Sequence, residues 1–210
     1  MLSLVFSLVL VSCQSTAKQQ ETKKIIENEG DLATAYFASG CFWCVEAIFE
    51  SVIGVSEAVS GYAGGKEQNP TYRQVANGIT GHTETVKVLY DPSKVSYEKL
   101  LVVYYGSHDP TTVNGQHPDY GKQYRSVIFY QNDEEKALAE KFKNTLGESG
   151  KYEKPIATQI VPFQKFWEAE EYHQDYERRN PEQPYIRRVS IPRLKRFQAK
   201  FPHLIKKVEH

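Results

Sequence analysis

The most reactive side chains of the sequence are two cysteines, which stand three residues apart in Gly40-Cys41-Phe42-Trp43-Cys44. They follow a strand-like run and precede residues with helical spacing. On a helix, this spacing places both thiols on one face. The unpaired N–H groups and the positive dipole end at a helix N-terminus predict a lowered pKa for the Cys41 thiol. The geometry therefore predicts an attacking thiol at Cys41 and a resolving thiol at Cys44.

Two alternatives to redox chemistry follow from the same residue types. In the first alternative, the cysteines are simply two buried side chains of the core. In the second, they are two ligands of a metal site. A metal half-site needs further ligands, and the six histidines offer no close pair at positions i and i+4. We therefore predict no metal. A general thiol–disulfide oxidoreductase and a non-catalytic zinc or scaffold protein stay open as other classes of function.

The residues between the cysteines, Phe42 and Trp43, narrow the redox chemistry. A thioredoxin-like motif has small or polar residues at these positions. Two large apolar side chains beside a nucleophilic thiol form a hydrophobic surface on which a substrate can dock. That surface suits a substrate with a methyl group on its reacting atom. Packing in the core is the alternative role for these two side chains.

Strand and helix patterns alternate along the rest of the chain. A short strand is expected over 33–38, followed by a helix in which Val45, Ile48, Phe49 and Val52 recur and which Gly54 closes. Further strands are expected over 55–62, 82–90, 126–130 and 157–161, and further helices over 96–105, 133–146, 168–178 and 192–201. We predict an α/β (α+β) fold. In it, a two-layer sandwich has a mixed sheet flanked by helices and a ferredoxin-like core, with Cys41 at the N-terminus of the first helix.

Composition excludes several classes of protein. The 210 residues contain 26 Lys+Arg and 26 Asp+Glu, and 40% are hydrophobic. This balance is unlike that of a polytopic membrane protein or a disordered chain, and it gives no reason to expect nucleic acid as a partner. Three cysteines are too few for a disulfide scaffold or a four-cysteine zinc site. The basic segment 187–210 is interpreted as a solvated helix face.

The N-terminal residues have the pattern of an exported protein. Residues 1–12 carry no charge and suit the apolar part of a signal peptide, although no Lys or Arg precedes them. Leu10-Val11-Ser12-Cys13 resembles a bacterial lipoprotein signal, which implies cleavage before Cys13 and its lipidation. Residues 13–30 are then a lipidated tether and 31–210 the catalytic domain, on the periplasmic or cell-surface side of the membrane. The alternative is a cytoplasmic protein with an apolar N-terminus.

Gly40-Cys41-Phe42-Trp43 resembles the signature of the peptide methionine sulfoxide reductase A family. Further blocks that resemble the family follow in order over roughly residues 33–190. They are Gly61-Tyr62-Ala63-Gly64-Gly65, Asn69-Pro70-Thr71-Tyr72, Gly81-His82-Thr83-Glu84, His108-Asp109-Pro110, Gly121-Lys122-Gln123-Tyr124-Arg125-Ser126 and Glu170-Glu171-Tyr172-His173-Gln174. The resemblance implies an enzyme that reduces methionine-S-sulfoxide, free and in proteins, and so repairs oxidative damage.

The resemblance also implies roles for single residues. Cys41 attacks the sulfoxide sulfur, and Glu84 protonates the departing oxygen, which needs a carboxyl group with a raised pKa. The substrate-binding residues would be two that hold the methyl group, two that hydrogen-bond the oxygen and one supporting carboxylate: Phe42 and Trp43, Tyr72 and Tyr124, and Asp119. Cys44 then forms a disulfide with the oxidised Cys41. An external dithiol, thioredoxin or a relative, reduces that disulfide, so no bound cofactor is expected. The enzyme is expected to be a monomer.

Two features depart from the family's usual sequence. Many relatives have glycine at position 44 and place the resolving cysteine in a C-terminal tail, whereas here no cysteine follows Cys44. The loop 113–120 lacks the arginine-containing run that is usual in the family. Asp119 lies in this loop, so its role is less directly implied by the resemblance than those of Cys41 and Glu84. Without the resemblance, Glu84 would be interpreted as a solvated carboxylate on a strand. His82 and His173 are interpreted as ordinary hydrogen-bonding groups with no assigned role.

Overall fold

The computed structural model describes residues 32–207, so the expected signal 1–12 and the expected tether 13–30 with Cys13 lie outside the described residues. The strands are β1 (Ala33–Ala38), β2 (Val55–Ala63), β3 (Thr83–Tyr90), β4 (Gly115–Gln116), β5 (Asp119–Tyr120), β6 (Val127–Tyr130), β7 (Gln159–Pro162) and β8 (Phe166–Glu168). The α-helices are α1 (Phe42–Glu50), α2 (Tyr72–Ala76), α3 (Tyr97–Gly106), α4 (Asp133–Glu148), α5 (Tyr176–Arg179) and α6 (Ile191–Lys200). None of the helices in this part of the chain is long and apolar enough to cross a bilayer.

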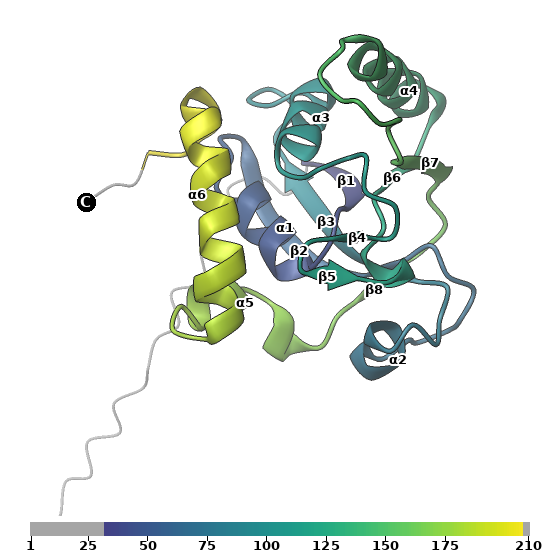
Figure 1. Cartoon of the computed structure of the whole chain (residues 1–210), viewed down its shortest axis with the longest axis vertical. Coiled ribbons are helices and arrows are strands. Elements are labelled where there is room, and N and C mark those ends of the chain that lie inside the picture. Colours follow the sequence, from purple (N-terminus) through teal and green to yellow (C-terminus); the bar gives the residue numbers. More distant parts are fainter. Residues whose placement is uncertain (1–31, 208–210) are drawn as a thin grey trace, which may run out of the picture.

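The strands form a six-stranded sheet in the order β7-β6-β1-β3-β2-β8 (Figure 1). The β6–β7 pair is parallel and the other neighbours are antiparallel, so the sheet is mixed. Helices α1 and α3 are the crossovers from β1 to β2 and from β3 towards β6. The chain therefore has the expected α/β fold with a mixed sheet and helices.

Side chains along each strand point alternately to the two faces of the sheet. In β1, Ala35 and Phe37 point into the large core that α1, α3 and α6 share, whereas Tyr36 and Ala38 point to a smaller cluster on the other face. The Phe37 ring stacks on Phe49 of α1 at 5.1 Å between ring centroids. This packing fixes α1, and with it the cysteines, against the middle of the sheet.

Local signals explain most element boundaries. The side chain of Ser96 accepts a hydrogen bond from the N–H of Lys99 and caps α3, and Asn132 caps α4 in the same way through Glu135. Thr71 and Gln74 form a capping box at α2, a helix that the sequence patterns do not predict.

The expected helix over 168–178 is wrong. Glu168 ends strand β8, where it pairs with Gly61 of β2, and only Glu171–His173 and Tyr176–Arg179 are short helical turns. The Gln174 side chain explains the difference, because its amide exchanges hydrogen bonds with the backbone N–H and C=O of Ser60. Tertiary hydrogen bonds therefore hold this segment against β2 in place of a continuous helix.

Candidate active site

Cys41 is the N-cap of α1 and lies at the sharp turn that follows β1. The turn requires Gly40, whose φ is +96° and where a Cβ would lie 3.0 Å from the side chain of Gln116. The backbone N–H of Cys44 donates to the carbonyl of Cys41 at 3.2 Å, so Cys44 lies in the first turn of the helix. Both cysteines are free thiols, 6% and 1% exposed. The fold therefore holds the two sulfurs together beneath the surface.

Glu84 lies on β3, where it pairs with Tyr62 of β2 and is 2% exposed. Its Oε2 accepts a hydrogen bond of 3.0 Å from the backbone N–H of Phe42, the first amide of α1. Burial raises the pKa of Glu84 to about 8, an effect that this hydrogen bond partly offsets. At neutral pH the carboxyl group is mostly protonated. It is bound to the backbone of Phe42, the residue that follows Cys41.

Aromatic rings surround the start of α1. Trp43 stacks on Tyr176 with ring centroids 3.9 Å apart, and its indole N–H donates to Nδ1 of His173 at 3.2 Å. The Phe42 ring contacts Tyr72 at 6.1 Å and His173 at 5.0 Å. His173 is 1% exposed and contacts both Phe42 and Trp43. It therefore connects the two side chains between the cysteines to the Tyr72 ring.

Asp119 lies on β5, the second strand of the β4–β5 hairpin, and Tyr124 lies in the short helical turn that follows the hairpin. Asp119 pairs with Gln116 across the hairpin, and its Oδ2 accepts a hydrogen bond of 2.5 Å from the Tyr185 hydroxyl. The same hydroxyl lies 3.8 Å from the Cys44 sulfur. Burial, and then the charge of Glu84, raise the pKa of Tyr124, so its phenol is a neutral hydrogen-bond donor near that carboxyl group.

The structure corrects the expected pKa of Cys41. The sequence predicts a thiol acidified by the helix N-terminus, but the N–H of Phe42 is already bound to Glu84. Burial, above all, raises the pKa of Cys41, and the hydrogen bond and charge of Cys44 raise it further. The hydrogen bond from Cys41 lowers the pKa of Cys44 to about 6, and the charge of Arg193 adds to this effect. The hydrogen bond between the two sulfurs therefore favours a thiolate on Cys44 over one on Cys41.

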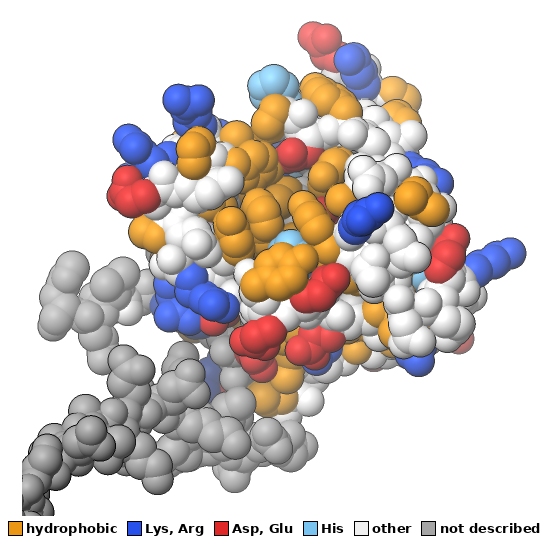
Figure 2. Space-filling model, turned by 90° about the horizontal axis from the view of Figure 1, so that it is seen from below, with side chains coloured by type: hydrophobic (Ala, Val, Ile, Leu, Met, Phe, Trp, Pro, Cys, Tyr) orange, Lys and Arg blue, Asp and Glu red, His pale blue; other side chains and the backbone are white. Residues whose placement is uncertain are grey.

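The expected site residues within the described part of the chain all lie in this one region: Cys41, Phe42, Trp43, Cys44, Tyr72, Glu84, Asp119 and Tyr124. Seen from below, hydrophobic side chains gather into a patch over this end of the molecule, with acidic groups at its edge (Figure 2). Tyr120 and Tyr172 are 63% and 54% exposed. Such a patch on an otherwise polar surface is typical of a binding site.

Three residues of the site were missed by sequence reasoning: His173, Tyr185 and Arg193. His173 stands in a quoted family block but was given no role. Tyr185 is one of fourteen tyrosines, and no local pattern distinguishes it. Arg193 was assigned to a solvated helix face, yet it is half-buried, and its guanidinium donates to the carbonyls of Ser39 and Ser107.

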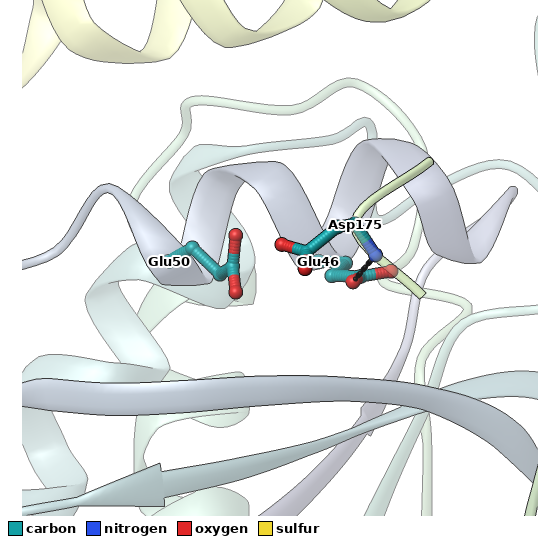
Figure 3. A group of neighbouring side chains, drawn as sticks. All are labelled: Glu46, Glu50 and Asp175. Carbon is teal, nitrogen blue, oxygen red and sulfur yellow. Dashed lines mark hydrogen bonds between the residues drawn. The ribbon is translucent and has the colours of Figure 1, made fainter. Parts of the chain in front are cut away.

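A group of three carboxylates lies beside the site on α1 and the segment before α5. Oxygens of Glu46, Glu50 and Asp175 fall within 4.8 Å of one another (Figure 3). Both Glu46 oxygens are already engaged, one by the Ser60 hydroxyl and one by the backbone N–H of Asp175 at 2.5 Å. Burial raises the pKa of Glu46 to about 8 and that of Glu50 to about 7, so at neutral pH Glu46 is mostly protonated and Glu50 is protonated about half of the time. This arrangement fits a hydrogen-bonding anchor better than a cation site.

The comparisons with known proteins agree with this site. The family model described as peptide methionine sulfoxide reductase matches residues 33–205. The chain is 51% identical over 172 residues to peptide methionine sulfoxide reductase MsrA 1 of Rhodopirellula baltica, covering 82% of this chain and 88% of that protein. It is 46% identical to MsrA of Trichodesmium erythraeum, covering 81% and 97%.

A solved structure extends the likeness to the fold. Methionine sulfoxide reductase A of Corynebacterium diphtheriae superimposes with a TM-score of 0.65 at 34% identity, covering 73% of this chain and 77% of that one. Sequence, fold and a paired-thiol site lined by aromatic rings thus agree. The chain belongs to the peptide methionine sulfoxide reductase MsrA family, and its activity is that of a peptide-methionine (S)-S-oxide reductase.

Proposed function

We propose that Cys41 is the nucleophile of this reductase. The observation that carries the proposal is the position of Cys41 as the N-cap of α1, next to the buried Glu84 and inside the ring of aromatic side chains. The Cys41 sulfur attacks the sulfoxide sulfur, so an S–S bond forms and the S–O bond breaks, and the protonated oxygen leaves as water. Water then adds to the Cys41 sulfur and the S–S bond breaks, which releases the methionine thioether. The sulfoxide is reduced by two electrons to the thioether, and Cys41 is oxidised to a sulfenic acid. Attack starts from the form of the thiol pair in which the charge lies on Cys41.

Glu84 supplies the proton that the oxygen needs. A sulfoxide oxygen leaves poorly until it is protonated, and a carboxyl group with a pKa of about 8 still holds its proton at neutral pH. Tyr72 and Tyr124 donate hydrogen bonds to the same oxygen, since burial raises the pKa of both phenols and keeps them neutral. Asp119 is the supporting carboxylate of the site, where it accepts a hydrogen bond from the hydroxyl of Tyr185.

Phe42 and Trp43 hold the methyl group of the substrate. Their rings are 6.1 Å apart and are fixed from behind by His173 and Tyr176. A rigid apolar wall binds a methyl group without the entropy loss of ordering mobile side chains. The exposed hydrophobic patch around the site accommodates the rest of a peptide or an unfolded protein segment, and free methionine sulfoxide needs only the residues around Cys41.

Cys44 resolves the sulfenic acid. It displaces the oxygen as water and forms the Cys41–Cys44 disulfide, for which the distance between adjacent positions on one helix face is suitable. A dithiol protein of the thioredoxin class then reduces this disulfide by two electrons and two protons, returning both thiols. The enzyme needs no bound cofactor for this cycle and is expected to act as a monomer.

One set of assays tests this scheme. Wild type, Cys41→Ser and Cys44→Ser are given a methionine-S-sulfoxide peptide with dithiothreitol, and insulin reduction is measured beside it. We expect sulfoxide loss that Cys41→Ser abolishes, and little turnover of insulin. Insulin reduction without sulfoxide loss would instead support a general thiol–disulfide oxidoreductase. Bound zinc, together with no loss of activity on Cys41→Ser, would support a non-catalytic zinc or scaffold protein.

We also propose the domain organisation and location expected from the sequence. The apolar stretch 1–12, the Leu10-Val11-Ser12-Cys13 motif and the polar stretch after it support a lipidated enzyme outside the cytoplasmic membrane, with 31–210 as catalytic domain. Mass spectrometry of the mature N-terminus tests this, because an unmodified residue upstream of Cys13 contradicts it. The strand order β6-β1-β3-β2 with crossovers α1 and α3 supports the ferredoxin-like, two-layer description of the core.

A further inference from the structure

Arg193 of α6 lies behind the thiol pair. Its Nε donates to the carbonyl of Ser107 at 2.9 Å, and its Nη2 donates to the carbonyl of Ser39 at 3.0 Å. A Cβ on Gly40, the residue directly before Cys41, would lie 3.4 Å from Nη1 of this guanidinium. The planar group is therefore held by two backbone oxygens at the turn that carries the cysteines.

The charge of Arg193 is not neutralised by an ion pair. None of the salt bridges formed within residues 32–207 includes it, and the acceptors of its hydrogen bonds are neutral oxygens. A half-buried cation of this kind interacts with the nearest anion more strongly than an exposed lysine does. Its charge acts on the carboxyl groups of Asp119 and Glu177 and, at this turn, on the thiolate of the cysteine pair.

We propose that Arg193 is a positioning residue for the resolving step, in which its guanidinium stabilises the Cys44 thiolate while the Cys41–Cys44 disulfide closes. This inference rests on the proposed role of Cys44 as the resolving thiol. It assigns to the C-terminal helix a part in recycling that is distinct from the reduction of the sulfoxide.

The resolving step requires a stabilised thiolate on Cys44, and a nearby cation can provide that stabilisation. The Cys44 thiolate attacks the sulfur of the Cys41 sulfenic acid, so an S–S bond forms and the S–O bond breaks. The oxygen leaves as hydroxide and takes a proton from solvent to become water. In this state the Cys41 thiol is no longer present to share the negative charge. Burial then opposes the Cys44 thiolate, and the other groups of the site must compensate for it.

The groups that face Cys44 come from several elements. Glu84 on β3 is acidic and disfavours the thiolate when it is ionised. The hydroxyls of Tyr185 and Ser190 favour the thiolate by hydrogen bonding, and Arg193 favours it by its charge. Asp119 on β5 also faces this site, because its carboxylate accepts a hydrogen bond from the same Tyr185 hydroxyl. Among these groups, Arg193 is the one that brings a full positive charge to Cys44.

The test measures the pKa of Cys44 by itself. In a Cys41→Ser background, the rate of alkylation of Cys44 is followed against pH, with and without Arg193→Gln. Glutamine retains an N–H donor for the backbone carbonyls but removes the charge. We expect the pKa of Cys44 to rise by about one unit. Arg193→Lys should restore most of the shift, and Arg196→Gln, an exposed arginine one turn along α6, is the matched control with no shift.

Kinetics give a second, independent signature. In enzyme with both cysteines, the sulfenic acid formed in one turnover is trapped with a dimedone-type reagent, and its rate of decay to the disulfide is measured. A one-unit rise in pKa lowers the thiolate fraction tenfold at low pH but raises thiolate nucleophilicity about threefold. Arg193→Gln should therefore close the disulfide about threefold more slowly at low pH and about threefold faster at high pH. A purely structural defect would slow the step at every pH.

The outcomes separate this inference from the proposed function. If Cys44→Ser cycles normally with a thioredoxin, the proposed role of Cys44 fails and this inference fails with it. If Cys44→Ser cannot cycle but Arg193→Gln leaves both the pKa and the pH profile unchanged, only this inference is overturned. Should Arg193→Gln not fold, Arg193→Met in the Cys41→Ser enzyme gives the same test, because methionine keeps an unbranched side chain but removes the charge. The pKa of Cys44 should again rise, and an unchanged or falling pKa overturns the inference.

Discussion

Replacing Glu84 with glutamine should make the enzyme much less active and, at neutral pH, relatively more stable. Glutamine fills nearly the same volume and can still accept the hydrogen bond from the N–H of Phe42, but it cannot donate the proton. Loss of a general acid lowers the rate of a proton-assisted step by about 10²–10⁴-fold. Because the pKa of Glu84 is about 8, the wild-type rate should fall above pH 8, whereas the residual rate of the variant should lack this decline.

The stability effect follows from burying a neutral carboxyl group. The pKa of Glu84 is about 8 in the fold against 4.5 for the free side chain. A raised pKa means that the stabilisation is complete below pH 4.5 and is lost as the pH rises towards 8, because the unfolded chain ionises first. The loss is about 1.4 kcal/mol per pH unit in this window. Glu84→Gln does not titrate, so its unfolding free energy should gain about 2–3 kcal/mol on wild type between pH 5 and pH 7.

The assays are single-turnover formation of methionine from an S-sulfoxide peptide and urea unfolding at the two pH values. Glu46→Gln is the matched control, because Glu46 is equally buried, has a pKa of about 8 and lies outside the catalytic group. It should show the same pH-dependent gain in stability with activity close to that of wild type. The reasoning is refuted if Glu84→Gln reduces the peptide within tenfold of the wild-type rate, or if its stability relative to wild type does not rise with pH.

Three further predictions concern other parts of the molecule. Cys44→Ser should release one equivalent of methionine per enzyme in a single turnover but fail to cycle with thioredoxin; full cycling would mean another recycling route. Tyr72→Phe and Tyr124→Phe should each lower kcat/KM by about 10–10³-fold with little change in unfolding free energy, since each removes one hydrogen-bond donor; unchanged kinetics would exclude them as donors. Gly61→Ala should destabilise the fold by about 3 kcal/mol or more in urea unfolding, because its Cβ would lie 2.3 Å from the Phe166 ring; a neutral effect would mean that strand β8 can move aside.

Much of the framework could be predicted from the sequence because its signals are local. The alternation of residues in 33–38 and 55–62 and the serine cap before 96–105 matched strands β1 and β2 and helix α3 closely. The i, i+3 spacing of the cysteines is sufficient to place both thiols in one helical turn. The segment 168–178 was predicted wrongly because the bonds between Gln174 and Ser60, 114 residues apart, outweigh its local helix preference.

The chemistry of the site was decided by tertiary contacts. Nothing in the neighbourhood of Glu84 distinguishes it from a solvated carboxylate, and its raised pKa comes from burial between β2 and α1. The pKa expected for Cys41 had the wrong direction, because burial, and then the hydrogen bond and charge of Cys44, raise it. The helix N–H that would stabilise a thiolate is bound to Glu84 instead.

The sequence by itself determined that two cysteines stand at the start of a helix, with apolar residues between them. Which thiol carries the charge was decided only in the folded chain. There α6 packs on α1 and brings Arg193, about 150 residues away in sequence, to the turn before Cys41. Spacing within one helix is a local property, whereas burial and the approach of a distant charge depend on how the elements pack, and these two effects dominate the energetics of an ionised sulfur.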